Sequence, residues 1–208
     1  MDGRADDDGG FVPDLAAWDA WRPEEIAARL AGLEGVPWCV VGGWALDLFL
    51  GGQRREHEDL EIAVPADRFD PIAAALPDLA FFTVGSGMAW PLEGNGALVR
   101  EHHQTWGRDR ETGLWRVDVM REPHDGDTWI ARRDGRVRMR YADLILRTAE
   151  GIPYARPETV LLFKAKATRP KDEDDFAAVL PHLSGEARRW LRAALATVHP
   201  GHTWLDVV

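Results

Sequence analysis

Residues 42–62 read GGWALDLFLGGQRREHEDLEI, and this stretch decides what kind of fold the chain can form. Before it, the short apolar run 38–41 lies between turn-forming residues and predicts a strand. Inside it, residues 44–50 predict a short helix that a second pair of glycines closes. A charged loop then leads to another predicted strand, 60–64. The stretch therefore predicts a strand, a glycine turn, a helix, a loop and a second strand.

The second strand carries an acidic pair, Asp59 and Glu61, on alternate positions. Residues two apart on a strand point to the same side, so Leu60 and Ile62 point to the opposite side, into the core. Two buried carboxylates this close repel each other, and one pKa rises unless a cation neutralises them. A divalent ion such as Mg²⁺, which prefers oxygen ligands, is the usual remedy. The alternative is an edge strand whose polar residues face water.

A third strand-borne acid occurs in RVDVM, residues 116–120. Val117 and Val119 face one way on this predicted strand, and Asp118 faces the other. If this strand lies beside the first acidic strand, three carboxylates converge on one patch. That arrangement fits a two-metal site for phosphoryl or nucleotidyl transfer.

Gly42 and Gly43 lie between the first strand and the helix. Glycine lets backbone N–H groups approach a ligand closely, and a helix N-terminus carries partial positive charge, so this turn can hold a phosphate. A tight turn without a ligand is the alternative. The segment matches neither the Walker loop nor the GxGxxG pattern. Asp47, one helical turn further on, is expected only to complement the helix dipole.

The remaining pattern predicts an α/β part followed by a helical part. We expect a flexible N-terminal arm over 1–13, an α/β domain over 14–150 and a helical region over 151–208. The expected helices begin at Pro23 and cover 68–76, 157–167 and 171–180, with another capped by Ser184. The further expected strands are 80–84, 97–101, 115–120, 128–132 and 137–140.

The composition excludes several classes of protein. The chain has 208 residues, a hydrophobic fraction of 45% and a formal net charge of −10. That charge argues against a general nucleic-acid binder, which neutralises phosphates with Lys and Arg. No apolar run is long enough to span a bilayer, and the acidic N-terminus does not look like a signal peptide, so we expect a cytoplasmic protein. A single cysteine, Cys39, excludes an internal disulfide and a cysteine zinc site.

Four basic residues are further candidates for contacts with phosphate: Arg55, His57, Lys164 and Lys171. The first two lie in the charged loop before the acidic strand, where exposed charges without a role are the alternative. The two lysines belong to a window of eight residues that holds all three lysines of the chain. They would share a face of one helix, but Pro170 is expected to break it.

These signals together resemble the polymerase-beta-like nucleotidyltransferase superfamily. Residues 41–64 have the sequence VGGWALDLFLGGQRREHEDLEIAV, which resembles the aminoglycoside and lincosamide nucleotidyltransferases. Residues 161–176, with the sequence LLFKAKATRPKDEDDF, resemble the helical part of the same enzymes. The resemblance implies an α+β fold with a small mixed β-sheet, flanking helices and a C-terminal helical region. It also implies that Asp59, Glu61 and Asp118 bind two Mg²⁺ ions, and that the glycines hold the triphosphate of ATP or another NTP.

The implied activity is Mg²⁺-dependent transfer of AMP from ATP to a hydroxyl group of a small acceptor, with an aminoglycoside or a lincosamide antibiotic as candidates. Asp118 would also help to deprotonate the acceptor. One departure is Glu61, where these antibiotic-modifying enzymes usually carry Asp. Two alternatives stay open. The protein could modify a macromolecule as part of a toxin–antitoxin pair, or bind nucleotides without catalysis.

Overall fold

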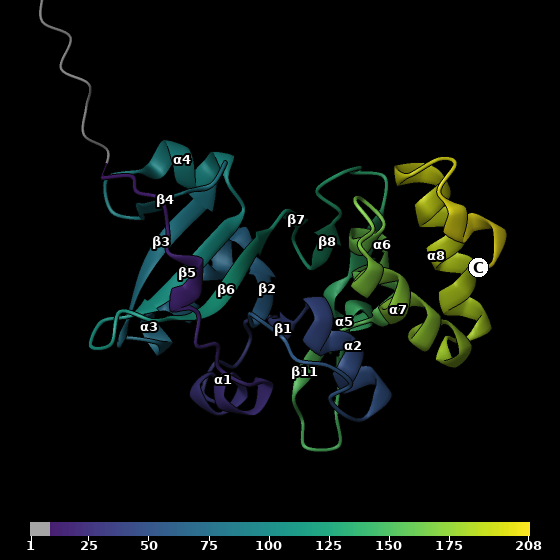
Figure 1. Ribbon diagram of the computed structural model, residues 1–208, viewed down its shortest axis with the longest axis horizontal. Helices are drawn as coiled ribbons and strands as arrows, with labels where there is room; N and C mark the ends of the chain where they lie inside the picture. Colours follow the sequence, from purple (N-terminus) through teal and green to yellow (C-terminus); the bar gives the residue numbers. More distant parts are fainter. Residues whose placement is uncertain (1–8) are drawn as a thin grey trace, which may run out of the picture.

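A mixed sheet of eight strands runs through the computed structural model, which describes residues 9–208 (Figure 1). Its strand order is β10-β11-β1-β2-β6-β5-β3-β4. The β1–β11 and β2–β6 pairs are parallel, and the other neighbours are antiparallel. A second sheet has the order β7-β8-β9. Together with the helices, these sheets confirm the predicted α+β class.

The strands and helices have the following bounds. The strands are β1 (Cys39–Val40), β2 (Glu61–Pro65), β3 (Leu79–Gly85), β4 (Met88–Pro91), β5 (Gln104–Asp109), β6 (Trp115–Glu122), β7 (His124–Asp125), β8 (Thr128–Ile130), β9 (Arg138–Arg140), β10 (Ile145–Arg147) and β11 (Pro153–Ala155). The α-helices are α1 (Pro23–Arg29), α2 (Gly42–Leu50), α3 (Phe69–Ala75), α4 (Gly96–Glu101), α5 (Tyr141–Leu144), α6 (Pro157–Lys164), α7 (Pro170–Val179) and α8 (Gly185–Val198).

The helices are unevenly distributed along the sheet. The C-terminal helices α6, α7 and α8 gather at one end of the molecule, and the antiparallel strands β3 to β6 form the other end (Figure 1). Helix α2 packs against α6, α7 and β11, so it links the helical end to the middle of the sheet. Among the residues that the structure describes, no helix has the length and apolar character needed to cross a bilayer.

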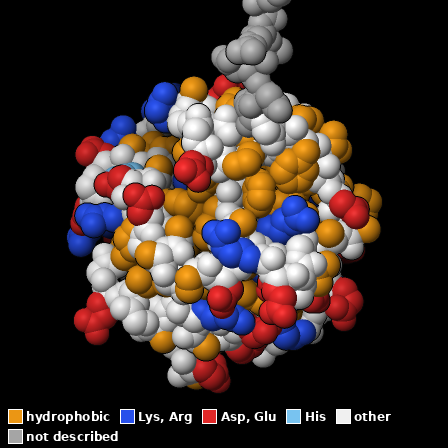
Figure 2. All heavy atoms as spheres, turned by 90° about the vertical axis from the view of Figure 1, so that its left-hand side faces the viewer, with side chains coloured by type: hydrophobic (Ala, Val, Ile, Leu, Met, Phe, Trp, Pro, Cys, Tyr) orange, Lys and Arg blue, Asp and Glu red, His pale blue; other side chains and the backbone are white. Residues whose placement is uncertain are grey.

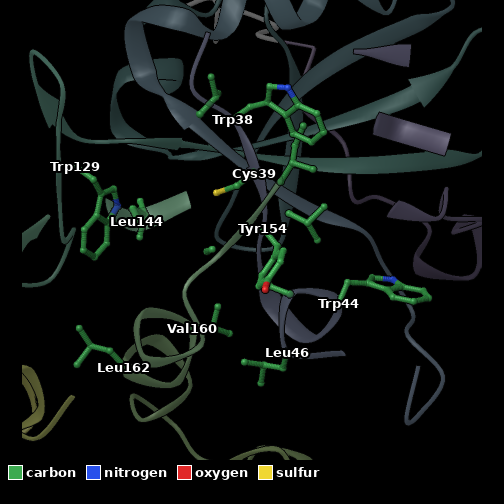
Figure 3. Close-up of a cluster of buried hydrophobic side chains, with 14 of the residues drawn as sticks. Trp38, Cys39, Trp44, Leu46, Trp129, Leu144, Tyr154, Val160 and Leu162 are labelled. Carbon is green, nitrogen blue, oxygen red and sulfur yellow. The ribbon is translucent and has the colours of Figure 1, made fainter. Parts of the chain in front are cut away.

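The core lies between the middle strands and the helices. Leu60 and Ile62, together with Val117 and Val119, are completely buried, as their alternation with the acids predicts. Figure 3 shows part of the same core, with side chains of β1, α2 and α6 among those drawn. Because apolar burial is the main driving force for folding, these alternate residues determine which side of β2 and β6 is left for polar groups.

Several predicted helices are confirmed. Helix α1 begins at Pro23, and the side chain of Ser184 caps α8 by accepting a hydrogen bond from the N–H of Ala187 at 3.1 Å. The expected break between the two lysines also occurs, since α6 ends at Lys164 and α7 begins at Pro170. Proline suits the first turn of a helix because it has no N–H to donate there.

The strand predicted over residues 97–101 is wrong, because helix α4 covers this segment. A short apolar run does not distinguish a strand from a helix by its periodicity. Here a distant residue favours the helix: the guanidinium of Arg121 donates to the carbonyl oxygens of Val99, at 2.6 Å, and His102, at 2.5 Å. These bonds satisfy carbonyl groups at the end of α4, which a helix of this length leaves unpaired.

The segment around the first glycines also differs from the prediction. Gly42 and Gly43 are the first two residues of α2 rather than a turn before it, and Gly42 has a positive φ of 62° that favours glycine. Strands β4, β5, β7, β10 and β11 were not predicted. The last of these lies beyond residue 150, yet it pairs with β1 in the main sheet.

The N-terminal segment crosses the antiparallel end of the sheet. Residues 1–8 of the predicted arm lie outside the described residues, but Phe11 exchanges two backbone hydrogen bonds with Ala89 of β4. Its ring also meets Phe82 edge-on, with the centroids 5.5 Å apart. Figure 2 looks at this end of the molecule, where hydrophobic side chains gather on the surface next to basic ones. The antiparallel strands and the C-terminal helices therefore lie at opposite ends of the molecule (Figure 1).

Candidate active site

Glu61 and Asp118 lie side by side on neighbouring parallel strands. Glu61 of β2 is directly opposite Asp118 of β6 in the strand register. Because paired residues of adjacent strands project to the same face, both carboxylates lie on the face of the sheet away from Ile62 and Val119. The predicted neighbourhood of these two acidic strands is therefore confirmed.

Asp59 lies just before β2 rather than on it, because the strand begins at Glu61. Its carboxylate is nevertheless close to the other two. Burial and the charge of Asp59 raise the pKa of Glu61 to about 7, although Lys164 opposes this shift. Burial also raises the pKa of Asp59, against the attraction of Lys171. Asp59, Glu61 and Asp118 thus form one cluster of mutually repelling acids, which we call the carboxylate face.

Asp118 is the most buried member of the carboxylate face, with 2% of its surface exposed. Gln104 of β5 donates a hydrogen bond to its Oδ2 at 2.8 Å. Its Oδ1 is buried and makes no hydrogen bond of normal geometry within residues 9–208, although the side chain of Trp106, opposite it on β5, favours the charged form of Asp118. Burial, and then the charge of Glu61, raise the pKa of Asp118 well above its usual range.

The two glycines make room for side chains of the site. A Cβ on Gly42 would overlap the carboxylate of Glu61. A Cβ on Gly43 would lie 2.5 Å from Nη2 of Arg55 and 2.6 Å from Nδ1 of His57. Each glycine therefore lets a charged or polar side chain lie directly against the first turn of α2.

Arg55 and His57 are held by acids of the protein itself. His57 Nε2 is 2.7 Å from Oδ2 of Asp47, which also accepts a hydrogen bond from the backbone N–H of Arg54 at 3.1 Å. Arg55 donates to Asp175 of α7, with Nη2 3.1 Å from Oδ2. Asp47 was expected only to complement the helix dipole, but at 3% exposure it ties the charged loop to α2.

The two candidate lysines have different surroundings. Lys164 Nζ lies 2.8 Å from Oδ1 of Asp172 and 3.0 Å from Oδ2 of Asp175. Lys171 is more exposed and makes a loose pair with Glu58 at 3.9 Å. Buried acids and the basic groups around them form an ion-pair network between the loop, α6 and α7. Its members are Arg54, Arg55, Lys164, Arg169, Asp172 and Asp175.

A cavity of 430 Å³ opens beside the carboxylate face. Of the predicted site residues, Gly42, Glu61 and Lys164 line it, whereas Asp59 and Asp118 lie outside its lining within the described chain. The sequence reasoning missed four basic residues of its wall: Arg132, Arg133, Lys166 and Arg169. Their only signal in the sequence is charge, which most surface arginines share.

The carboxylate face has the chemistry of a divalent-metal site. The oxygen donors and the mutual repulsion of the three acids fit a hard cation such as Mg²⁺. In the described part of the chain, however, no group of three His, Cys, Asp or Glu side chains is already arranged to hold a metal ion. The Glu61 carboxylate lies against Gly42 and Asp118 Oδ2 is held by Gln104, so the three acids are neighbours without converging on one point.

Part of the sequence matches a known protein family. Residues 24–93, which include the glycines of α2 and the acids of β2, match the sequence profile of the aminoglycoside-2''-adenylyltransferase family. No curated protein is similar enough in sequence to count as a relative.

Two solved structures share the fold, and a third is less similar. A solution structure of the antibiotic-resistance factor ANT(2'')-Ia matches 88% of this chain and 91% of its own, with a TM-score of 0.56 and 15% identity. A crystal structure of ANT(2'')-Ia with adenylyl-2''-tobramycin matches 84% and 95%, with a TM-score of 0.54 and 13% identity. The lincomycin-bound lincosamide adenylyltransferase LnuA matches 74% and 89%, with a TM-score of 0.48 and 18% identity.

The profile match covers the glycines and the acidic pair, and the ANT(2'')-Ia structures share the fold over most of the chain. The profile match and the shared fold together support a nucleotidyltransferase enzyme similar to the aminoglycoside-2''-adenylyltransferases.

Proposed function

We propose that this protein transfers AMP from ATP to a hydroxyl group of an aminoglycoside or lincosamide antibiotic, in a Mg²⁺-dependent reaction that releases pyrophosphate. The observation that carries the proposal is the register of Glu61 with Asp118, next to Asp59, on one face of the sheet. Acids that repel one another this strongly are typical of sites that work with a bound cation.

Each acid has a proposed role. Asp59, Glu61 and Asp118 would hold two divalent ions, which when bound neutralise the charge that develops on the transferred phosphate. Asp118 would also accept the proton of the acceptor hydroxyl, as a carboxylate held beside the reacting group can. The remaining catalytic power would come from holding the two substrates in a reactive orientation.

The first turn of α2 and the nearby basic residues would bind the triphosphate. Gly42 lies at the N-terminus of α2, where unpaired N–H groups and the helix dipole favour an anion, and Lys164 lines the same cavity. Gly43 would contribute its backbone, with Arg55 and His57 fixing the shape of this turn from one side. Lys171, whose charge stabilises the ionised form of Asp59, stays a proposed contact for phosphate on that side of the site.

The acceptor would approach from the side of Asp59. Glu58 lies beside it, and the whole chain carries a net charge of −10, which favours a cationic acceptor such as an aminoglycoside. The family match points to the same class of acceptor.

The test is transfer of label from ATP labelled at its α-phosphate, with Mg²⁺ and a panel of aminoglycosides and lincosamides. We expect labelled antibiotic that is lost on chelating the metal and in an Asp59→Asn variant. Absence of transfer to every antibiotic would contradict the proposal. Label on a macromolecule in a lysate would then favour the toxin–antitoxin alternative, and metal-dependent ATP binding without transfer would favour a non-catalytic module.

A further inference from the structure

The cavity extends along the sheet away from the carboxylate face. Glu61 and Ala63 of β2 line it, as do Met120 and Glu122 of β6. Glu61 pairs with Asp118, and Glu122 pairs with Pro65, four residues further along β2. At about 3.3 Å per strand residue, the two ends of the cavity are about 13 Å apart. A nucleoside that extends from a phosphate at Glu61 has the length to reach the level of Glu122.

The charges of the cavity wall favour an anion over a polycation. Five basic side chains line the cavity against three acidic ones, in a chain whose net charge is −10. The basic residues are Arg132, Arg133, Lys164, Lys166 and Arg169, and the acidic residues are Glu61, Glu122 and Asp172. A polycationic acceptor would meet repulsion here, whereas a nucleoside triphosphate would not.

The far end of the cavity is apolar apart from one polar cluster. Cys39, Leu144 and Trp129 line this end, and Figure 3 shows the Cys39 sulfur directed toward Leu144 and Trp129. Glu122 accepts a hydrogen bond from Nε1 of Trp129 at 3.1 Å and pairs with Arg132 at 3.3 Å. A mostly apolar wall with a few placed polar groups is typical of a site for a small organic molecule.

Two polar atoms of this cluster are buried without a partner in residues 9–208: the hydroxyl of Tyr141 and Nε of Arg132. Tyr141 is 7% exposed, lines the cavity and lies close enough to Glu122 for that charge to raise its pKa. Buried donors without a hydrogen-bond partner lower the stability of the fold, and a bound ligand could form the missing hydrogen bonds.

We propose that this cavity holds the nucleoside of the NTP and that Glu122, Tyr141 and Arg132 recognise the edge of a purine base. This rests on the proposed function, and it makes these residues specificity-determining rather than catalytic. Glu122 accepts a hydrogen bond from the amino group of the base, Tyr141 and Arg132 donate to its ring nitrogen or oxygen, and the apolar wall contacts its faces.

The test measures binding without turnover, by calorimetric titration with α,β-methylene-ATP and, separately, with inorganic tripolyphosphate, both in the presence of Mg²⁺. Tyr141→Phe removes only the hydroxyl. We expect it to weaken binding of the ATP analogue by about 3- to 10-fold, the worth of one hydrogen bond, and to leave tripolyphosphate binding unchanged. Its thermal stability is not lowered, because the lost hydroxyl has no partner among the described residues.

The matched control is Tyr154→Phe, since the chain has two tyrosines and Tyr154 is buried outside the cavity lining in the described residues. Equal binding of the analogue by Tyr141→Phe and the unaltered protein would overturn the inference. A Tyr141→Phe variant that weakens only the binding of the acceptor would also overturn it, because the cavity would then be the acceptor-binding site. An unaltered protein that binds neither probe would instead overturn the proposed function, and this inference with it.

Discussion

The carboxylate face and the ion-pair network contain the same kinds of acidic residue, but their charges are balanced in opposite ways. In the network, burial opposes ionisation of Asp172, yet hydrogen bonds from Arg169 and Lys164 hold its pKa below the usual range. On the carboxylate face, burial and neighbouring acids hold the pKa values of Glu61 and Asp118 above it. Acids paired with Arg or Lys side chains stabilise the fold, whereas the acids of the carboxylate face are available to bind a ligand.

The largest effect is expected from Asp118→Asn, which should lower kcat for adenylyl transfer by about 10³-fold, as expected for loss of a general base. The free energy of unfolding should not fall, because the substitution removes a buried charge that has no cation beside it. Steady-state kinetics and urea unfolding measure the two quantities. Asp70→Asn, an exposed acid of α3, is the control. A fall in kcat of less than tenfold would contradict the proposed difference between the carboxylate face and the ion-pair network.

The network should show the opposite behaviour. Asp175→Asn leaves Lys164 and Arg55 without their shared carboxylate, so we expect the free energy of unfolding to fall by about 3 kcal/mol. Urea unfolding measures this change. The adjacent acid Asp174 is exposed, and Asp174→Asn should stay within about 0.5 kcal/mol of the unaltered protein. Similar values for the two variants would show that Asp175 does not act through its ion pairs.

The network also predicts an acid limit to stability. Asp172 and Asp175 have folded-state pKa values below the ordinary 3.8 of an aspartate, because their cations favour the charged form. Their contribution is therefore complete above pH 3.8 and is lost as the pH falls below it, by up to about 1.4 kcal/mol per pH unit for each proton taken up. Unfolding followed from about pH 5 to pH 2 should show a shallower slope in Asp172→Asn. Identical slopes would argue that other acids set this limit.

The smallest effect is expected at Lys171, which lies at the edge of both regions. Its pair with Glu58 is loose and exposed, so Lys171→Ala should change the free energy of unfolding by less than about 0.5 kcal/mol. The KM for ATP should rise by no more than about twofold, and by less than in Lys164→Ala. If Lys171→Ala has the larger effect on KM, the triphosphate lies on the Asp59 side rather than in the cavity.

The acids of the site were predictable because their signal is local. Leu60, Ile62, Val117 and Val119 alternate with carboxylates, and alternation alone separates the two faces of a strand. Gln104 and Tyr141 carry no such signal, because each matters through a strand or a cavity that other segments build. The bond from Arg55 to Asp175 spans 120 residues, and nothing in the loop sequence indicates its partner.

By itself, the sequence determined the strand–helix–strand unit around residues 42–62, the side of β2 that faces the core, and the break between α6 and α7. Those features depend on side-chain alternation and on the backbone limits of glycine and proline, which act over a few residues. Only the tertiary structure decided that Glu61 and Asp118 share one register, that Lys164 is paired with buried acids, and that residues 97–101 form a helix. These depend on packing between distant segments, where contacts across the fold override local preference.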